Sequence, residues 1–252
     1  EIFPATPWGA MGIKVFDFDN DQRFDIMITD MHVDMWDNAS FEKMVPDYEK
    51  KKLRDPHKYQ SAGYLDSDGK HIWGNALFRN NGEGTFTEVS DAMNAENYWP
   101  WGLSIGDLNA DGYEDVFITS SMNYPFRYAV NSVLLNNLGE NFLDSEFIVG
   151  VEPRRDGRTA IPWFELDCDG EDQSHPHCKS RKGKFEVWGA LGSRSSAIFD
   201  LEGDGDLDIV TNDFNSEPMV LVSNLSDQKP LNYLKIKLIG SYVHLFYGHR
   251  KI

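Results

Sequence analysis

The chain of 252 residues is long enough for one large domain or two small ones. It carries 24 Lys and Arg against 41 Asp and Glu, a formal net charge of −17, which argues against nucleic acids and anionic membranes as partners because binding them needs clustered basic residues. Apolar residues make up 40% of the chain, which is enough for a folded core. No run of apolar residues is nearly as long as the about 20 that a membrane-spanning helix needs.

Three segments of the sequence align without gaps and share an acidic loop. Each loop has Asp, Asn or Glu at its first, third, fifth and ninth positions, and runs of Val, Ile, Phe and Thr flank it on both sides. Such flanks are typical of β-strands. We call residues 17–25 loop one, residues 107–115 loop two and residues 200–208 loop three.

A second element follows each acidic loop. An apolar run, an Asn- and Gly-rich turn and a run around a Phe occupy 75–89 and 131–144, and a truncated copy occupies 220–224. This pattern predicts a β-hairpin. Four short strands per repeat predict an all-β fold of four-stranded antiparallel sheets, as in the blades of a β-propeller. Closed propellers have about four to eight blades, so we expect these three repeats to be part of a larger propeller.

Two insertions lengthen the repeats, at about 32–73 and about 152–185. We expect a propeller segment over 1–231, with both insertions forming loops on its rim, where repeat proteins usually bind their partners. Helical periodicity is weak throughout, except at 41–53.

The acidic loops have the donor chemistry of calcium sites. Carboxylate and amide oxygens at alternate positions of a tight turn suit Ca²⁺, which takes six to eight oxygen ligands, better than Mg²⁺, which demands stricter geometry. An EF-hand needs Glu at the twelfth position, where this chain has Ile28, Ile118 and Thr211. We therefore expect about three Ca²⁺ ions. Gln22 at the sixth position of loop one and the longer Glu202 at the third position of loop three predict weaker sites there than in loop two.

Residues 107–115 and 77–89 resemble the FG-GAP/VCBS repeat family, and in particular its cartilage-acidic-protein-like branch. Residues 232–240 look like the opening strand of the ASPIC/UnbV module that follows the propeller in that branch, so 232–252 is assigned to a stub of it. The resemblance implies blades with calcium loops, and backbone carbonyl ligands from Arg23, Tyr113 and Asp206. The side-chain ligands that it implies are Asp17, Asp19, Asp21 and Asp25, then Asp107, Asn109, Asp111 and Asp115, then Asp200, Glu202, Asp204 and Asp208.

The family is mostly exported, which predicts an extracellular or periplasmic location. A disulfide between Cys168 and Cys178 would suit that location and is the favoured reading of the second insertion. Two other readings stay open. One is a zinc site made by both cysteines with His175 and His177, and the other is a degenerate calcium loop starting at Asp167.

The sequence thus predicts an exported, calcium-binding propeller that binds protein or glycan through its insertion loops, as an adhesion or scaffold module. A rival hypothesis is a lyase or hydrolase acting on carbohydrate, with acidic residues and histidines of the insertions as its catalytic groups. A third is a structural subunit of a surface layer or filament. The histidines of the insertions are His57, His71, His175 and His177.

Overall fold

The computed structural model describes residues 2–7, 9–31, 71–72, 74–121, 128–240 and 242–248, of which residue 71 and residues 242–248 are described by their backbone alone. Nearly all of the first predicted insertion, with the helical periodicity at 41–53, lies outside these residues. Among the described residues, no helix is long and apolar enough to cross a membrane.

The first two repeats each form a four-stranded antiparallel sheet, which confirms the predicted fold class. Blade one has the strand order β2-β3-β5-β6, and blade two has the order β7-β8-β9-β10. In both, the acidic loop joins the first two strands and an Asn-rich turn joins the last two. The strands are β2 (Ala10–Phe16), β3 (Asp25–Asp30), β5 (Ala76–Gly82), β6 (Thr85–Glu88), β7 (Pro100–Gly106), β8 (Asp115–Ser120), β9 (Ser132–Asn136) and β10 (Phe142–Asp144).

Blade three has three strands in the part of the chain that the structure describes: β13 (Gly192–Phe199), β14 (Asp208–Phe214) and β15 (Val220–Leu221). The turns before β6 and β10 use Gly82 and Gly139 with φ of 78° and 79°, a conformation that favours glycine. The third repeat has no glycine after Asn224, and the chain continues into α5 (Leu225–Gln228) and the hairpin of β16 (Tyr233–Ile239) and β17 (Tyr242–Gly248).

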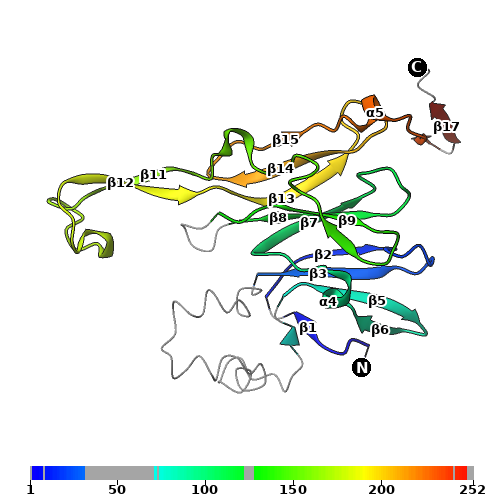
Figure 1. The fold of residues 1–252 in the computed structure, drawn as a ribbon, viewed down its shortest axis with the longest axis horizontal. Coiled ribbons are helices and arrows are strands. Elements are labelled where there is room, and N and C mark those ends of the chain that lie inside the picture. The colour runs from blue at the N-terminus through cyan, green and yellow to red at the C-terminus, as the bar shows by residue number, and fades with distance from the viewer. Residues whose placement is uncertain are drawn as a thin grey trace.

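The second insertion, which links blades two and three in the chain, forms a long hairpin that extends away from the blades (Figure 1). Its strands are β11 (Ala160–Asp167) and β12 (Lys184–Ala190), so the hairpin runs beyond the predicted end of the insertion at 185. The other short elements are β1 (Thr6–Pro7), β4 (His71–Ile72), α4 (Ser90–Met93), η3 (Arg155–Gly157) and η4 (Pro176–Cys178).

The three blades stack face to face, with their first strands β2, β7 and β13 side by side (Figure 1). The Thr29 hydroxyl accepts a hydrogen bond from the Gly12 N–H (3.0 Å) and donates one to the Trp101 carbonyl of the next blade (2.7 Å). A side chain at Gly12 would collide with Leu103, because its Cβ would lie 2.8 Å from Leu103 Cδ2. Glycine therefore lets the two backbones approach closely.

Each pair of neighbouring blades encloses a hydrophobic core. The core between blades one and two is rich in aromatic side chains, including Phe16, Phe18 and Phe142. The core between blades two and three is smaller, and its fully packed members are Phe117, Val133, Val151 and Ile209. The acidic loops lie at one end of this stack, where β2, β7 and β13 end.

Candidate metal centres

The first carboxylate of each acidic loop fixes the turn through backbone hydrogen bonds. In loop two, Asp107 accepts hydrogen bonds from the N–H groups of Asp111 (3.0 Å) and Gly112 (2.9 Å). The three loops therefore share one backbone conformation. The corresponding bonds run to Asp17 from Asp21 (3.0 Å) and Gln22 (2.8 Å), and to Asp200 from Asp204 (3.0 Å) and Gly205 (3.2 Å).

The sixth position of each loop has a left-handed backbone. Gly112 and Gly205 have φ of 94° and 100°, and Gln22 in loop one takes the same region with φ of 69°. This conformation costs a non-glycine residue about 1–2 kcal/mol of free energy. Loop one nevertheless keeps the shape of the other two, so Gln22 does not make its backbone irregular.

The ninth carboxylate of each loop is buried and joins the loop to the third strand of its blade. One oxygen accepts the N–H of the loop's second residue, and the other accepts an N–H from the third strand or, in blade three, from the second residue after it. Burial raises the pKa of Asp25 and of Asp115 to about 6, although these backbone bonds act to lower it. The donors are Phe18 (3.2 Å) and Asn80 (2.8 Å) to Asp25, Leu108 (2.8 Å) and Asn136 (2.7 Å) to Asp115, and Leu201 (2.7 Å) and Ser223 (2.9 Å) to Asp208.

The third position of loops one and two presents a buried oxygen that accepts no hydrogen bond. These atoms are Oδ1 of Asp19 and Oδ1 of Asn109. The other oxygen of Asp19 lies 3.1 Å from Nε of Arg79, and the amide nitrogen of Asn109 donates to Asp111 (2.9 Å). Buried polar atoms normally have a partner, so two orphaned oxygens at equivalent positions fit a ligand that the protein alone does not supply.

In loop one the acidic groups also converge. Ligand oxygens of Asp17, Asp19 and Asp21 all lie within 4.8 Å of one another. Among the described residues, no other group of three His, Cys, Asp or Glu residues meets this criterion. Loop two has the amide of Asn109 in place of one carboxylate.

Loop three differs, because the chain itself covers part of its donor set. The Lys235 ammonium lies 3.7 Å from Asp200 Oδ2 and donates to the Gly203 carbonyl (2.8 Å). The backbone N–H of Ser226 donates to the Asp206 carboxylate (2.8 Å), and the Ser226 hydroxyl donates to Asp204. Glu202 is exposed. Lys235 and Ser226 thus contact part of the donor set of loop three, as Arg79 contacts Asp19 in loop one.

The remaining predicted site residues have other contacts. The guanidinium of Arg23 pairs with Asp21 and donates to the Asn80 carbonyl (2.9 Å). The N–H of Tyr113 donates to Asp111 (2.9 Å). The structure therefore ties the seventh residue of loops one and two to the fifth carboxylate, and the role of both carbonyls as ligands stays a prediction.

The structure joins Cys168 and Cys178 in a disulfide, with their Cα atoms 5.2 Å apart, so neither offers a thiolate to zinc. The rings of His175 and His177 stack with their centroids 5.3 Å apart beside this disulfide. His57 and the side chain of His71 lie outside the described residues.

Sequence reasoning missed a second set of repeated polar residues, at the end of the blades opposite the acidic loops. An Asn at the start of the third strand accepts the N–H of the residue that ends the second strand, and a Glu accepts the N–H of that Asn. The signal was available, because these residues recur at one spacing in the first two repeats. The bonds are Asp30 to Asn75 (3.1 Å) and Asn75 to Glu96 (3.0 Å) in blade one, and Ser120 to Asn131 (2.9 Å) and Asn131 to Glu152 (3.2 Å) in blade two.

Comparison with known families adds one result to this geometry. Residues 62–118 match the family model of the FG-GAP-like repeat. The matched segment runs from the outer half of blade one through loop two to β8, so the FG-GAP-like repeat includes the acidic loop with the most regular sequence. A search of the curated proteins found no match to the chain. The resemblance of 232–240 to ASPIC/UnbV, and of the chain to the cartilage-acidic-protein-like branch, stays a prediction.

Proposed function

We propose that this chain is a calcium-stabilised binding module of an exported protein. The observation that carries the proposal is the pair of buried, unpartnered oxygens on Asp19 and Asn109, at the third position of two loops with the same backbone. Oxygen ligands in a flexible turn are the preferred environment of Ca²⁺. Bound calcium would neutralise the repulsion among the clustered carboxylates and fix the end of each blade.

The partner in this proposal is a protein or a glycan, bound by the second insertion. Its hairpin exposes Trp163, Phe164 and Trp188, whose side chains are 40%, 39% and 51% accessible. Exposed aromatic side chains supply large contact areas in recognition surfaces. The FG-GAP-like repeat is itself consistent with a β-propeller-like binding or adhesion module. The cavity between blades two and three is lined by neither histidine nor carboxylate, so it is not the site that the catalytic rival requires.

The test is thermal unfolding in excess CaCl₂ and in chelator. A ligand that binds only the folded state at 100 times its Kd adds about 2.7 kcal/mol per site. For a chain of this size that raises the melting temperature by about 5–10 °C. Asp19→Ala should reduce the calcium-dependent rise, because it removes the third-position oxygen, whereas Glu140→Gln, at an exposed acid outside the acidic loops, should leave it unchanged. Equal melting temperatures in calcium and chelator would overturn the proposal.

A further inference from the structure

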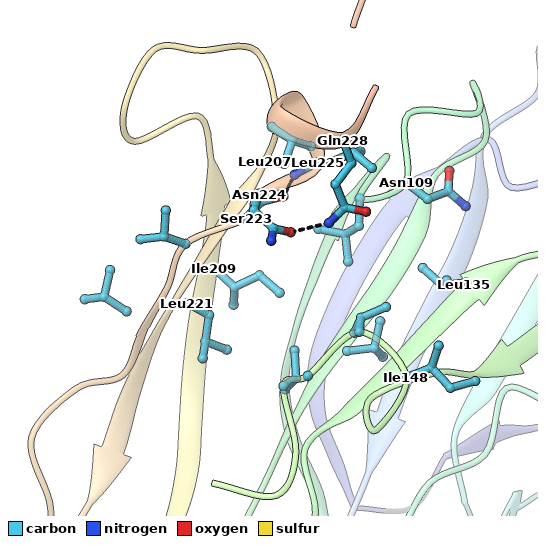
Figure 2. Close-up of a pocket in the computed structure, with 17 residues that line it drawn as sticks. Asn109, Leu135, Ile148, Leu207, Ile209, Leu221, Ser223, Asn224, Leu225 and Gln228 are labelled. Atoms are coloured by element: carbon cyan, nitrogen blue, oxygen red, sulfur yellow. Dashed lines mark hydrogen bonds between the residues drawn. The ribbon is translucent and has the colours of Figure 1, made fainter. Parts of the chain in front are cut away.

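A cavity of about 660 Å³ opens between blades two and three (Figure 2). Its walls are mostly aliphatic: Leu135 and Ile148 come from blade two and the segment after it, and Ile209 and Leu221 come from blade three. A hydrogen bond between Asn224 and Gln228 (2.7 Å) borders one end. This volume is within the range of ligand pockets in proteins.

In the equivalent core between blades one and two, a phenylalanine of the fourth strand of blade two takes part of this space. Phe142 of β10 is 1% exposed, with its ring 6.4 Å from that of Phe18. The core residues around Phe142 correspond one by one to residues that line the cavity, but Phe142 itself has no counterpart in the described part of blade three. The pairs are Phe18 with Leu108, Leu77 with Val133, Ala95 with Val151, Val116 with Ile209, and Leu134 with Leu221.

The edge of β15 next to this cavity has no strand paired to it among the described residues. The N–H of Ser223 points toward β14, where it donates to Asp208 (2.9 Å). Successive N–H groups of a strand point to opposite sides, so the N–H of Val222 faces the open edge. The side chains of Val220 and Val222 are 54% and 49% exposed. The backbone thus offers a template for a further strand.

We propose that blade three binds an extended peptide of another protein by strand addition to β15, with an aromatic side chain of that peptide in the cavity. The pattern is given by Asn141 and the strand β10 that follows it, whose Phe142 and Leu143 pair with β9 in the same place of blade two. Main-chain hydrogen bonds would supply affinity, and the aliphatic cavity that takes the aromatic side chain would supply specificity. The net charge of −17 favours a neutral or basic peptide.

The chain carries one similar sequence of its own, Asn232, Tyr233 and Leu234, but the structure holds it elsewhere. The ring of Tyr233 packs so closely on Gly205 that a side chain there would clash with it. Lys235 donates to the Gly203 carbonyl (2.8 Å). Strand β16 is therefore engaged on loop three and does not pair with the edge of β15.

This inference extends the proposed binding role to a second surface and does not require calcium. The probe is a synthetic peptide that copies residues 139–145, with lysine in place of Glu140 and Asp144 to complement the acidic protein. A control peptide has alanine in place of Phe142. Each is titrated into the ¹⁵N-labelled chain and followed by NMR chemical shifts, once in CaCl₂ and once in chelator.

We expect shifts at β15 and the cavity walls, and binding weaker by about tenfold or more for the alanine peptide, because it loses a buried aromatic ring. Val222→Pro removes the N–H on the open edge, where proline is tolerated, and should weaken binding by about tenfold or more. Val222→Ala keeps that N–H and should bind within about twofold of the unchanged chain.

Three outcomes would overturn the proposal: no shifts with either peptide, binding that ignores Val222→Pro, or a dimer in sedimentation that Val222→Pro dissociates. The last would show that a second copy fills the cavity. Peptide binding that is equal in calcium and chelator, with no calcium effect on melting, would contradict the metal proposal and support this one.

Discussion

At the scale of single residues, Glu96 is the acidic side chain whose raised pKa matters most for the pH dependence of stability. Its carboxylate accepts the Asn75 N–H, and the acidic side chains of Asp91, Glu88 and Asp30 lie around it. Burial raises the pKa of Glu96 to about 8, from an ordinary value of 4.5, and the three neighbouring carboxylates raise it further while the hydrogen bond lowers it. The folded chain therefore keeps a proton at neutral pH that the unfolded chain releases.

This shift makes the free energy of unfolding fall as pH rises from about 4.5 to about 8. Below that window both states are protonated at Glu96, and above it both are ionised. Glu96→Gln keeps the acceptor oxygen but cannot ionise, so near pH 9 it should stabilise the chain by about 2 kcal/mol, and near pH 5 it should change little. Denaturant unfolding at both pH values measures this, with the exposed Glu140→Gln as control. The prediction would be wrong if the free energies of unfolding of Glu96→Gln and the unchanged chain differed by the same amount at both pH values.

The shared turn of the acidic loops was predictable because it follows a local, repeated spacing, whereas the ligand role of its side chains stays a prediction. The first and fifth carboxylates act within a few positions of themselves, as the bond from Tyr113 to Asp111 shows. The roles of Asn75 and Glu96 depend on a contact between segments that are 21 residues apart, and only the recurrence of this spacing at Asn131 and Glu152 could have pointed to it. The cation at loop three, Lys235, comes from still further along the chain.

At the scale of elements, the hairpin β11–β12 has the features of an independent unit. It has a small core of its own, formed by Leu166 and Val187 with the disulfide of Cys168 and Cys178. The sequence indicated an insertion here but not a paired hairpin, because the strands lie far from any repeat. The truncated hairpin copy at 220–224 did point to a shortened blade three, of which the structure describes three strands.

We expect the double substitution Cys168→Ser with Cys178→Ser to loosen the tip of this hairpin and leave the blades intact. The disulfide closes a short loop, whose constraint contributes about 2–3 kcal/mol locally. Lys179, Arg181 and Lys182 lie beside it and offer trypsin sites. Limited proteolysis should therefore cut the variant there faster, whereas the thermal unfolding of the blades should move little. A large fall in the melting temperature would show that the hairpin supports the stack.

At the scale of the whole molecule, the net charge of −17 opposes the compact state. In chelator, raising NaCl from about 0.05 to about 0.5 M should raise the melting temperature, because salt screens repulsion between exposed charges over about 10 Å or less. CaCl₂ at equal ionic strength should add a further rise, and MgCl₂ a smaller one. If the melting temperatures in the three salts were equal at equal ionic strength, the effect of calcium would be explained by charge screening alone.

The contact at Gly12 is repeated one blade further along. A Cβ on Gly12 would lie 3.1 Å from the Trp101 carbonyl oxygen, and one on Gly102, which holds the same place in the next repeat, would lie 3.0 Å from that of Arg194. Blade one therefore packs on blade two, and blade two on blade three, through the same kind of contact between a glycine and a backbone carbonyl. A gene encoding such a unit can be duplicated in tandem, and the new copy finds its complementary neighbour on both sides. The glycine contact thus allows blades to be added to the stack one whole repeat at a time.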